Sequence, residues 1–301
     1  MTTTETVPTI EKPKLLEHKS FPEKTESVVE ALRRSQLLFD LKKSGKSTKE
    51  AVEIGALSLS ESDDLGFSES EKNLLGVISH LGSFVTAQRR ADELSDVAKD
   101  SRLSSDQRDE LKVLKNNDII PFNHTLKELI NTNSSLTKDE LDVGLTRLYM
   151  KLFYRDDPIV VRADTDGTHD QELIHAISQD AFSGISKTTN GMRHEIASEA
   201  MLLAANIDYN HQLSVEKDAN GADYLVYVDY RWTYIDIKAS QTRAVRALSK
   251  RPDSHAVWTG LKPADFTGVY GNQVNGLCIP FDKAKELSGA FVQQIYDVTR
   301  R

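Results

Sequence analysis

The sequence has almost none of the residues that cross-link a protein or anchor it in a membrane. Its only cysteine, Cys278, lies in the apolar run Leu277-Cys278-Ile279, so we expect a small buried side chain there. A disulfide within the chain and a zinc site built from several cysteines are excluded. The sequence contains no run of about 18 apolar residues, so no membrane span is predicted. Residues 1–13 have no apolar stretch typical of a secretory signal, and we therefore expect a cytoplasmic protein.

A general excess of positive charge is also missing. The 301 residues include 38 Lys and Arg against 46 Asp and Glu, which gives a formal net charge of -8. Neither half of the chain is basic as a whole, so the protein is not a generic binder of nucleic acid. Any contact with phosphates must come from a local patch.

Helical signals dominate the first half. Ser47, Ser68 and Thr137 each stand three residues before a glutamate, which is the pattern of a capping box. Apolar spacing predicts a helix over 25–43, and another after Thr137 that stops before Asp156-Asp157-Pro158. We therefore expect a disordered tail at 1–24 and a helical domain at 25–157 that serves recognition, homodimerisation or binding of a protein partner.

The pattern changes at residue 158, where we place the domain boundary. Short apolar runs predict strands at 159–161, 211–217, 223–229, 232–238, 255–259 and 276–280. Helical periodicity predicts helices at 171–183, 192–206, about 242–250 and 282–298. Residues 158–301 are therefore expected to form an α/β or α+β domain with a mixed central sheet flanked by helices.

Residues 221–240 are the stretch in which chemistry-bearing side chains gather. They read as two strands joined by a tight turn near Asp229 to Trp232. If the strands pair antiparallel, Asp223 lies close to Asp236 and Lys238. Two acids and a lysine at the end of one hairpin can bind a hard divalent cation and orient a water beside it.

The order of these residues resembles the PD-(D/E)xK nuclease superfamily, the fold of many restriction enzymes, Holliday-junction resolvases and repair nucleases. The resemblance rests on a helical acid, Glu195, a lone Asp223 at the start of a strand, and Asp236-Ile237-Lys238 at the end of the next strand. It covers residues 190–285. It implies a restriction-endonuclease-like fold and a Mg²⁺-dependent nuclease, with Mn²⁺ able to substitute. The implied substrate is DNA rather than RNA, cut by an endonuclease of the restriction, repair or phage and mobile-element type.

The same resemblance assigns roles to the residues. Asp223 and Asp236 would be metal ligands, the carbonyl of Ile237 a third ligand, and Glu195 an additional and often water-mediated one. Lys238 would position or deprotonate the attacking water and stabilise the phosphorane. Aspartate at 236 stands where glutamate is commoner in the family, and this change removes no ligand.

A local basic patch accompanies the hairpin. Residues 231–251 hold six basic side chains and one acid, and Arg243, Arg246 and Lys250 fall on one helix face. We expect these three, with Arg231 and Gln241, to contact the phosphates that flank a scissile bond. A solvated helix face explains the patch equally well. The neighbouring tryptophans and tyrosines are expected to be mainly core and sheet-face residues.

Two alternatives stay open. Residues 159–168 join a strand-like run to Asp164-x-Asp166-Gly-Thr, which resembles the first motif of haloacid dehalogenase-type phosphatases. Asp164 would then be the nucleophile and Asp166 the acid/base, although the family's acidic motif is not found downstream. The second alternative is a non-catalytic nucleic-acid-binding module on a nuclease fold, which the intact Asp223, Asp236 and Lys238 argue against. His194 is expected to be a satisfied or exposed histidine rather than a metal ligand.

Overall fold

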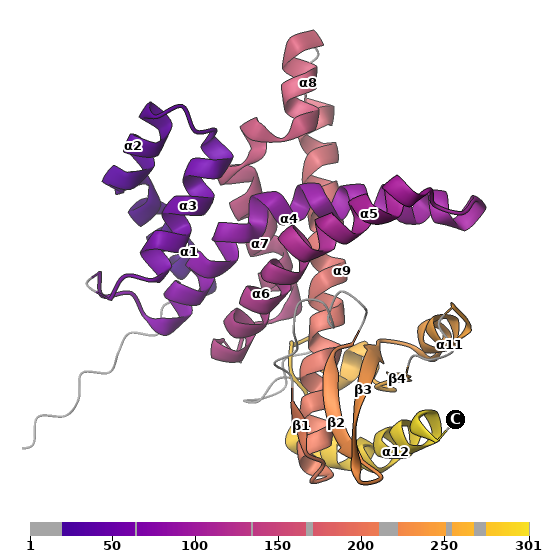
Figure 1. Cartoon of the computed structure of the whole chain (residues 1–301). Coiled ribbons are helices and arrows are strands. Elements are labelled where there is room, and N and C mark those ends of the chain that lie inside the picture. The colour runs from indigo at the N-terminus through magenta and orange to yellow at the C-terminus, as the bar shows by residue number, and fades with distance from the viewer. Residues whose placement is uncertain are drawn as a thin grey trace, which may run out of the picture.

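The computed structural model describes residues 20–63, 65–133, 135–166, 171–210, 222–250, 255–267 and 275–300. Helices form most of this part of the chain, and a small mixed sheet lies in its last third, as an α+β class requires (Figure 1). The helices before the sheet are α1 (Phe21–Arg34), α2 (Gln36–Lys43), α3 (Thr48–Ser60), α4 (Glu69–Asp100), α5 (Ser105–Leu114), α6 (Ile120–Thr132), α7 (Lys138–Leu152), α8 (Pro158–Asp166) and α9 (Gln171–Ala204). A π-helical turn at Lys115–Ile119 joins α5 to α6, and a 3-10 turn at Tyr154–Asp156 follows α7.

The predicted capping boxes begin three of these helices. The hydroxyls of Ser47, Ser68 and Thr137 each accept a hydrogen bond from the N–H of the glutamate three residues later. The expected single helix over 25–43 is wrong, because the backbone at Ser35 is extended (φ -65°, ψ 121°) and divides it into α1 and α2. None of the described helices has the length and apolar character needed to cross a bilayer.

The strand expected at 159–161 is also wrong, since these residues begin helix α8. Asp157 precedes the helix and its Oδ1 accepts the N–H of Ile159 at 2.9 Å, while Pro158 occupies the first helical position. An acceptor at the N-cap followed by proline is a strong helix start, and it overrides the β preference of the Ile-Val-Val run. Asp164 and Asp166 therefore end a helix instead of following a strand, which removes the strand that the phosphatase motif needs. Gly167 and Thr168 lie outside the described residues.

Helix α9 joins the two parts of the protein. Helices expected at 171–183 and 192–206 are one continuous helix of 34 residues. Its first half contributes Ile177 and Ile185 to the core of the helical part, and its second half contributes Met201 and Leu202 to the core under the sheet. The buried Thr189, just before Asn190-Gly191, donates to Asp142 of α7 at 2.6 Å, and this packing helps to hold the helix through its middle.

The sheet has four strands in the order β1 (Tyr209–Asn210), β2 (Tyr224–Val228), β3 (Arg231–Lys238) and β4 (Ala256–Trp258). β1–β2 and β2–β3 are antiparallel, and β3–β4 is parallel. The strands expected at 223–229, 232–238 and 255–259 are confirmed, as are the helices α11 (Gln241–Lys250) and α12 (Phe281–Thr299). Residues 276–280 form no strand, only an isolated bridge from Gly276 to Thr137. Residues 211–217 lie outside the described part.

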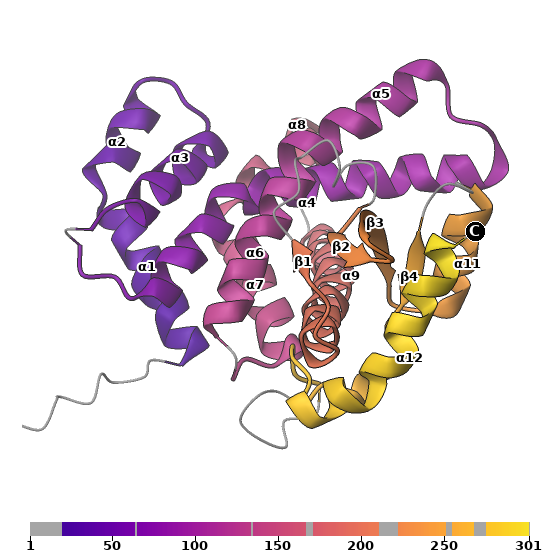
Figure 2. The same ribbon diagram turned by 60° about the horizontal axis from the view of Figure 1, so that its bottom comes forward.

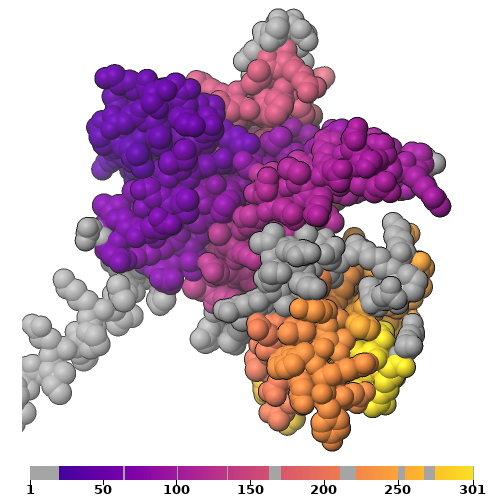
Figure 3. All heavy atoms as spheres, in the orientation of Figure 1, coloured from indigo at the N-terminus to yellow at the C-terminus, as the bar shows by residue number. Residues whose placement is uncertain are grey.

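The two faces of the β2–β3 hairpin differ. Tyr224, Val226, Ile235 and Ile237 are buried in one core with residues of α9 and α12. Both helices lie beside the strands in Figure 2. The other face carries Tyr227, Trp232 and Tyr234, which are 39%, 52% and 39% exposed. Asp236 and Lys238 continue this second face, because alternate residues of a strand share a side. In Figure 3 the sheet part forms a lobe below the helical part, and α5 projects above it.

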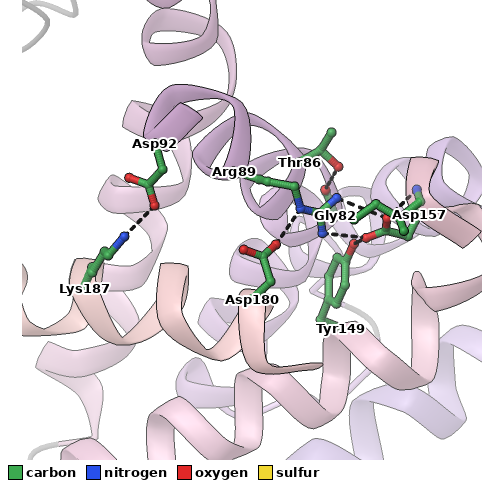
Figure 4. A network of polar contacts seen from close by, with 9 residues as sticks. Gly82, Thr86, Arg89, Asp92, Tyr149, Asp157, Asp180 and Lys187 are labelled. Atoms are coloured by element: carbon green, nitrogen blue, oxygen red, sulfur yellow. Dashed lines mark hydrogen bonds and ion pairs between the residues drawn. The ribbon is translucent and has the colours of Figure 1, made fainter. Parts of the chain in front are cut away.

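Arg89 of α4 ties together three segments of the helical part (Figure 4). Its guanidinium donates to both carboxylate oxygens of Asp157 at 3.1 and 2.9 Å and to Asp180 of α9 at 2.5 Å. The hydroxyl of Tyr149 in α7 donates to Asp157 at 2.5 Å. A bidentate Arg–carboxylate pair is among the strongest polar contacts in proteins, so this network fixes α4, α7, α9 and the start of α8 relative to one another.

Side chains of neighbouring segments approach Gly82 of α4 so closely that the position has no room for a side chain. A Cβ there would lie 2.7 Å from the Phe153 ring and 2.9 Å from a Glu53 oxygen. We expect Gly82→Ala to lower the free energy of unfolding by about 1–3 kcal/mol, measured by urea denaturation. Gly191→Ala in α9 is the control, because its Cβ meets nothing within 4 Å. It should stabilise by up to about 1 kcal/mol through helix propensity. Equal effects at the two sites would contradict the overpacking argument.

Candidate functional site

The β2–β3 ladder brings Asp223 to the same end of the hairpin as Asp236 and Lys238. Tyr224 pairs with Ile235 in the antiparallel ladder, and the N–H of Asp223 donates to the carbonyl of Ile235 at 2.8 Å. The connecting residues Asp229 and Tyr230 have positive φ angles of 50° and 63°. Two such residues in a two-residue loop match the twist of a tight hairpin, and this turn fixes which residues face each other at the far end.

Two short contacts hold the side chains at that end. The Oδ2 of Asp223 accepts the backbone N–H of Ile237 at 2.5 Å. The ammonium of Lys238 forms an ion pair with Oδ1 of Asp236. The backbone N–H of Asp236 donates to the carbonyl of His255, just before β4, at 3.1 Å. The carboxylates and the lysine are therefore positioned by rigid strands on both sides of β3.

The direction of the Ile237 peptide follows from these hydrogen bonds. Ile235 and Ile237 bond toward β2, whereas Asp236 and Lys238 bond toward β4. The N–H and C=O of one strand residue point to the same side. The Ile237 carbonyl therefore points to the side on which Asp223 lies, so two carboxylates and one carbonyl belong to the same end of the hairpin.

The negative charge of Glu195 acts on Asp223, which places this glutamate near the same end of the hairpin. The pKa of Asp223 is raised well above its usual value by burial, then by the negative charge of Glu195, and then by that of Asp236. Lys238 and the Ile237 N–H offset part of this effect. Crowding of like charges is relieved when a cation binds among them, so this environment suits a cation.

The residue types fit a magnesium ion better than a zinc ion. Within the described ranges, no three side chains of His, Cys, Asp or Glu are grouped around one metal position. Mg²⁺ is commonly held by one or two carboxylates and completes its shell with waters and substrate phosphates. Asp223, Asp236 and the Ile237 carbonyl form a donor set of that kind.

The expected phosphate-binding residues are only partly brought together. Gln241, Arg243 and Arg246 are exposed on α11, which begins three residues after Lys238. The side chain of Lys250 lies outside the described part. Arg231 stands at the opposite end of β3, about 23 Å from Lys238 at the usual rise per residue, and donates to the carbonyl of Thr299. It holds the end of α12 and lies away from the other expected site residues.

Sequence reasoning missed a contact from the helical part. Lys127 of α6 lies 2.5 Å from Oε1 of Glu199 and 3.3 Å from the Tyr224 hydroxyl. That hydroxyl lies 3.0 Å from both the backbone carbonyl of Glu195 and Oε1 of Glu199, which share its single proton as acceptors. The only signal in the sequence is that Glu199 follows Glu195 by one helical turn. The helical part thus supports the segment of α9 that carries Glu195.

His194 is a satisfied histidine, as expected. It is buried, its Nδ1 lies 2.6 Å from the Thr259 hydroxyl, and its ring meets Phe266 edge-on at 5.1 Å. Burial, followed by the charges of Arg193 and Arg243, lowers the pKa of His194 from 6.5 to about 4. The ring is therefore neutral at neutral pH and serves as a structural partner of Thr259.

This shift predicts a pH dependence of stability. The unfolded histidine takes up a proton below pH 6.5, while the folded one resists protonation down to about pH 4. Stability should therefore fall as pH decreases across that window, by on the order of 2 kcal/mol for this group once pH 5 is reached. Urea denaturation at pH 7.5 and pH 5 measures the loss. His194→Gln should reduce the loss, whereas replacement of the exposed His175 by glutamine should not. An unchanged loss in His194→Gln would contradict the assignment.

The site therefore combines two neighbouring carboxylates, a strand carbonyl, an ion-paired lysine and a nearby helical glutamate at one end of a hairpin. In comparisons with known proteins, no family model, no curated protein and no solved structure matches the chain.

Proposed function

We propose that the protein is a Mg²⁺-dependent nuclease that hydrolyses phosphodiester bonds, with DNA as its substrate and endonucleolytic action. One observation carries the proposal. Asp223 accepts the N–H of Ile237, the residue between Asp236 and Lys238, and Lys238 pairs with Asp236 at the same end of the hairpin. This arrangement supports a restriction-endonuclease-like assignment for the sheet part, because it brings together the residues on which the resemblance rests.

Each group has a chemical task in this proposal. Mg²⁺ bound by Asp223, Asp236 and the Ile237 carbonyl would supply Lewis-acid stabilisation of charge on the scissile phosphate. Lys238 holds a positive charge and a proton donor beside Asp236, where it orients the attacking water and stabilises the developing negative charge. Glu195 adds a third carboxylate to the field around Asp223. Lys127 and Tyr224 act through α9 by holding the turn that carries Glu195.

The surface beside the site suits an extended polyanion. The exposed face of β2 and β3 leads to Asp236 and Lys238 and presents Tyr227, Trp232 and Tyr234. Aromatic faces stack on nucleic-acid bases without regard to sequence. Arg243 and Arg246 on α11 follow directly and provide positive charge for the backbone in an otherwise acidic protein.

Trp232 tests the role of the aromatic face. Trp232→Ala should weaken binding of a single-stranded oligonucleotide by about 1–3 kcal/mol, or about 5- to 150-fold in Kd. Fluorescence anisotropy in EDTA measures the affinity without cleavage. Phe39→Ala is the control, since Phe39 is a 62% exposed aromatic on α2, away from the sheet. Equal affinities of the two variants would show that the sheet face does not contact the bases.

The decisive experiment is a cleavage assay with the full-length protein. Linear, nicked, single-stranded and branched DNA, and RNA, are incubated with Mg²⁺, Mn²⁺ or EDTA. We expect internal cleavage of a DNA substrate in Mg²⁺ or Mn²⁺ and none in EDTA. No metal-dependent cleavage of any substrate would overturn the proposal. Binding without cleavage would favour a non-catalytic module, and release of phosphate from a small phosphomonoester that depends on Asp164 would favour a phosphatase.

A further inference from the structure

A polar cavity lies on another side of α9 from Glu195. It has a volume of about 550 Å³, within the range of about 300–1,000 Å³ typical of small-molecule sites. α9 contributes Phe182, Ser186 and Arg193, α7 contributes Lys138, and α11 contributes Arg243. The cavity is thus built where the helical part meets the segment that follows Lys238.

The cavity does not overlap the carboxylate site. Its α9 residues recur at spacings of three and four, which places them on one helix face. Glu195 lies two residues beyond Arg193, about 200° further around the helix. The two sites therefore use opposite faces of α9, and a ligand in the cavity would not compete for the groups around Asp223.

Arg193 is the unusual residue in the lining. It is 4% exposed, and its guanidinium donates only to the amide oxygens of Asn275 and Asn190, at 2.9 and 2.8 Å. Its Nε is buried and has no hydrogen-bond partner among the described residues. The Phe266 ring lies 4.3 Å from the guanidinium carbon. The nearby acids Asp142 and Asp139 act on Arg193 through their charge, but its hydrogen-bond acceptors are neutral amides. A buried cation with one donor unused retains a preference for an anion.

The other lining charges leave the cavity positive. The lining holds four cations, Lys138, Lys187, Arg193 and Arg243, and two acids, Asp139 and Asp142. Lys187 is already paired with Asp92, outside the lining, at 2.6 Å. Asp142 is already paired with Lys138 and also accepts the Thr189 hydroxyl. Arg243 forms no ion pair with any described residue and is exposed. Two arginines are thus available to one ligand, and planar guanidinium groups match the oxygens of a phosphate.

We propose that this cavity binds the phosphate group of a nucleotide, either a free nucleotide or the phosphorylated end of a nucleic-acid strand. Arg193 and Arg243 hold the phosphate oxygens, and the hydroxyls of Ser183 and Ser186 line the same space. Phe182, 40% exposed, also lines it and offers an apolar surface for the base. The proposal does not depend on nuclease activity, because it concerns equilibrium binding on the other face of α9.

Calorimetric titration of the full-length protein in EDTA tests the proposal. The probes are inorganic phosphate, 5′-AMP, and one single-stranded oligonucleotide with either a 5′-phosphate or a 5′-hydroxyl. We expect phosphate and AMP to bind, and Arg243→Gln to weaken both at least about tenfold, as the loss of a charge-assisted hydrogen bond implies. Tighter binding of the phosphorylated oligonucleotide than of AMP and of the hydroxyl form identifies a strand end as the occupant. Equal binding of AMP and the phosphorylated strand identifies a free nucleotide.

The controls keep this test decisive. Arg108→Gln removes the same charge from an exposed position on α5 and should leave the affinities unchanged. Arg193→Lys keeps the buried charge but loses the planar fork, so it should also weaken phosphate binding if the variant folds. Binding of neither phosphate nor AMP at millimolar concentration overturns the proposal, as does equal weakening by Arg243→Gln and Arg108→Gln. Arg243 also belongs to the surface proposed to hold the DNA backbone, so the cleavage assay uses the unaltered protein. Failure of phosphate and AMP binding and failure of cleavage by the unaltered protein are therefore separate outcomes.

Discussion

Replacement of Lys238 by methionine is expected to lower the single-turnover rate of cleavage by about 10²–10⁴-fold. The ammonium of Lys238 is held against Asp236 at the end of β3, so the charge is fixed where the reaction would need it. Methionine has a similar length and shape and keeps the strand packing, but it can neither donate a proton nor stabilise an anion. The affinity for DNA in EDTA should change little, because one partly exposed cation contributes only part of the binding of a polyanion.

Matched variants separate catalysis from general charge. Lys285→Met removes an exposed lysine from α12 and should leave the rate unchanged. Asp236→Asn should also lower the rate strongly, and raising the Mn²⁺ concentration should recover part of it, because a carboxylate ligand and not the lysine is lost. If the unaltered protein cleaves DNA and Lys238→Met cleaves it at the same rate, the hydrolysis uses another site.

The hairpin could be predicted because its information is local. Residues 221–240 contain two β-rich runs, a two-residue turn and the side chains at both ends, so the antiparallel register follows from the turn position alone. The capping boxes at Ser47, Ser68 and Thr137 were correct for the same reason, since each depends on four consecutive residues.

Other features depend on distant parts of the chain and could not be read from local patterns. The strand at 159–161 was a wrong prediction, because the Asp157-Pro158 helix start outweighs three β-branched residues once Asp157 is fixed by Arg89. The contact of Lys127 with Glu199 spans 72 positions in the sequence. The cavity lined by Arg193 draws on α7, α9 and α11, and no single stretch of the sequence contains its charge pattern.

Removal of the Asp157 carboxylate should cost more stability than any other single change at a polar residue considered above. The side chain is fully buried, whereas Arg89 is 15% exposed, and Asp157 receives hydrogen bonds from Arg89, Tyr149 and Ile159. Burial would raise the pKa of Asp157, but the hydrogen bonds from these partners outweigh it and lower the pKa below 3.8. The carboxylate is therefore ionised in the folded protein at neutral pH, and Arg89 depends on it for charge compensation.

We expect Asp157→Ala to lower the free energy of unfolding by about 3–5 kcal/mol, because it leaves a largely buried arginine without its main partner and removes the acceptor at the start of α8. Urea denaturation at pH 7 measures the loss. Asp180→Ala removes the other carboxylate bound to Arg89, but Asp180 is 42% exposed, so its loss should cost at most about 1 kcal/mol. Because the pKa of Asp157 is lowered, its contribution is present above pH 3.8 and is lost as pH falls through the folded pKa. The difference in stability between the unaltered protein and Asp157→Ala should therefore shrink in acid, and a difference that stays constant down to the acid transition would contradict an ionised Asp157 as the centre of the network.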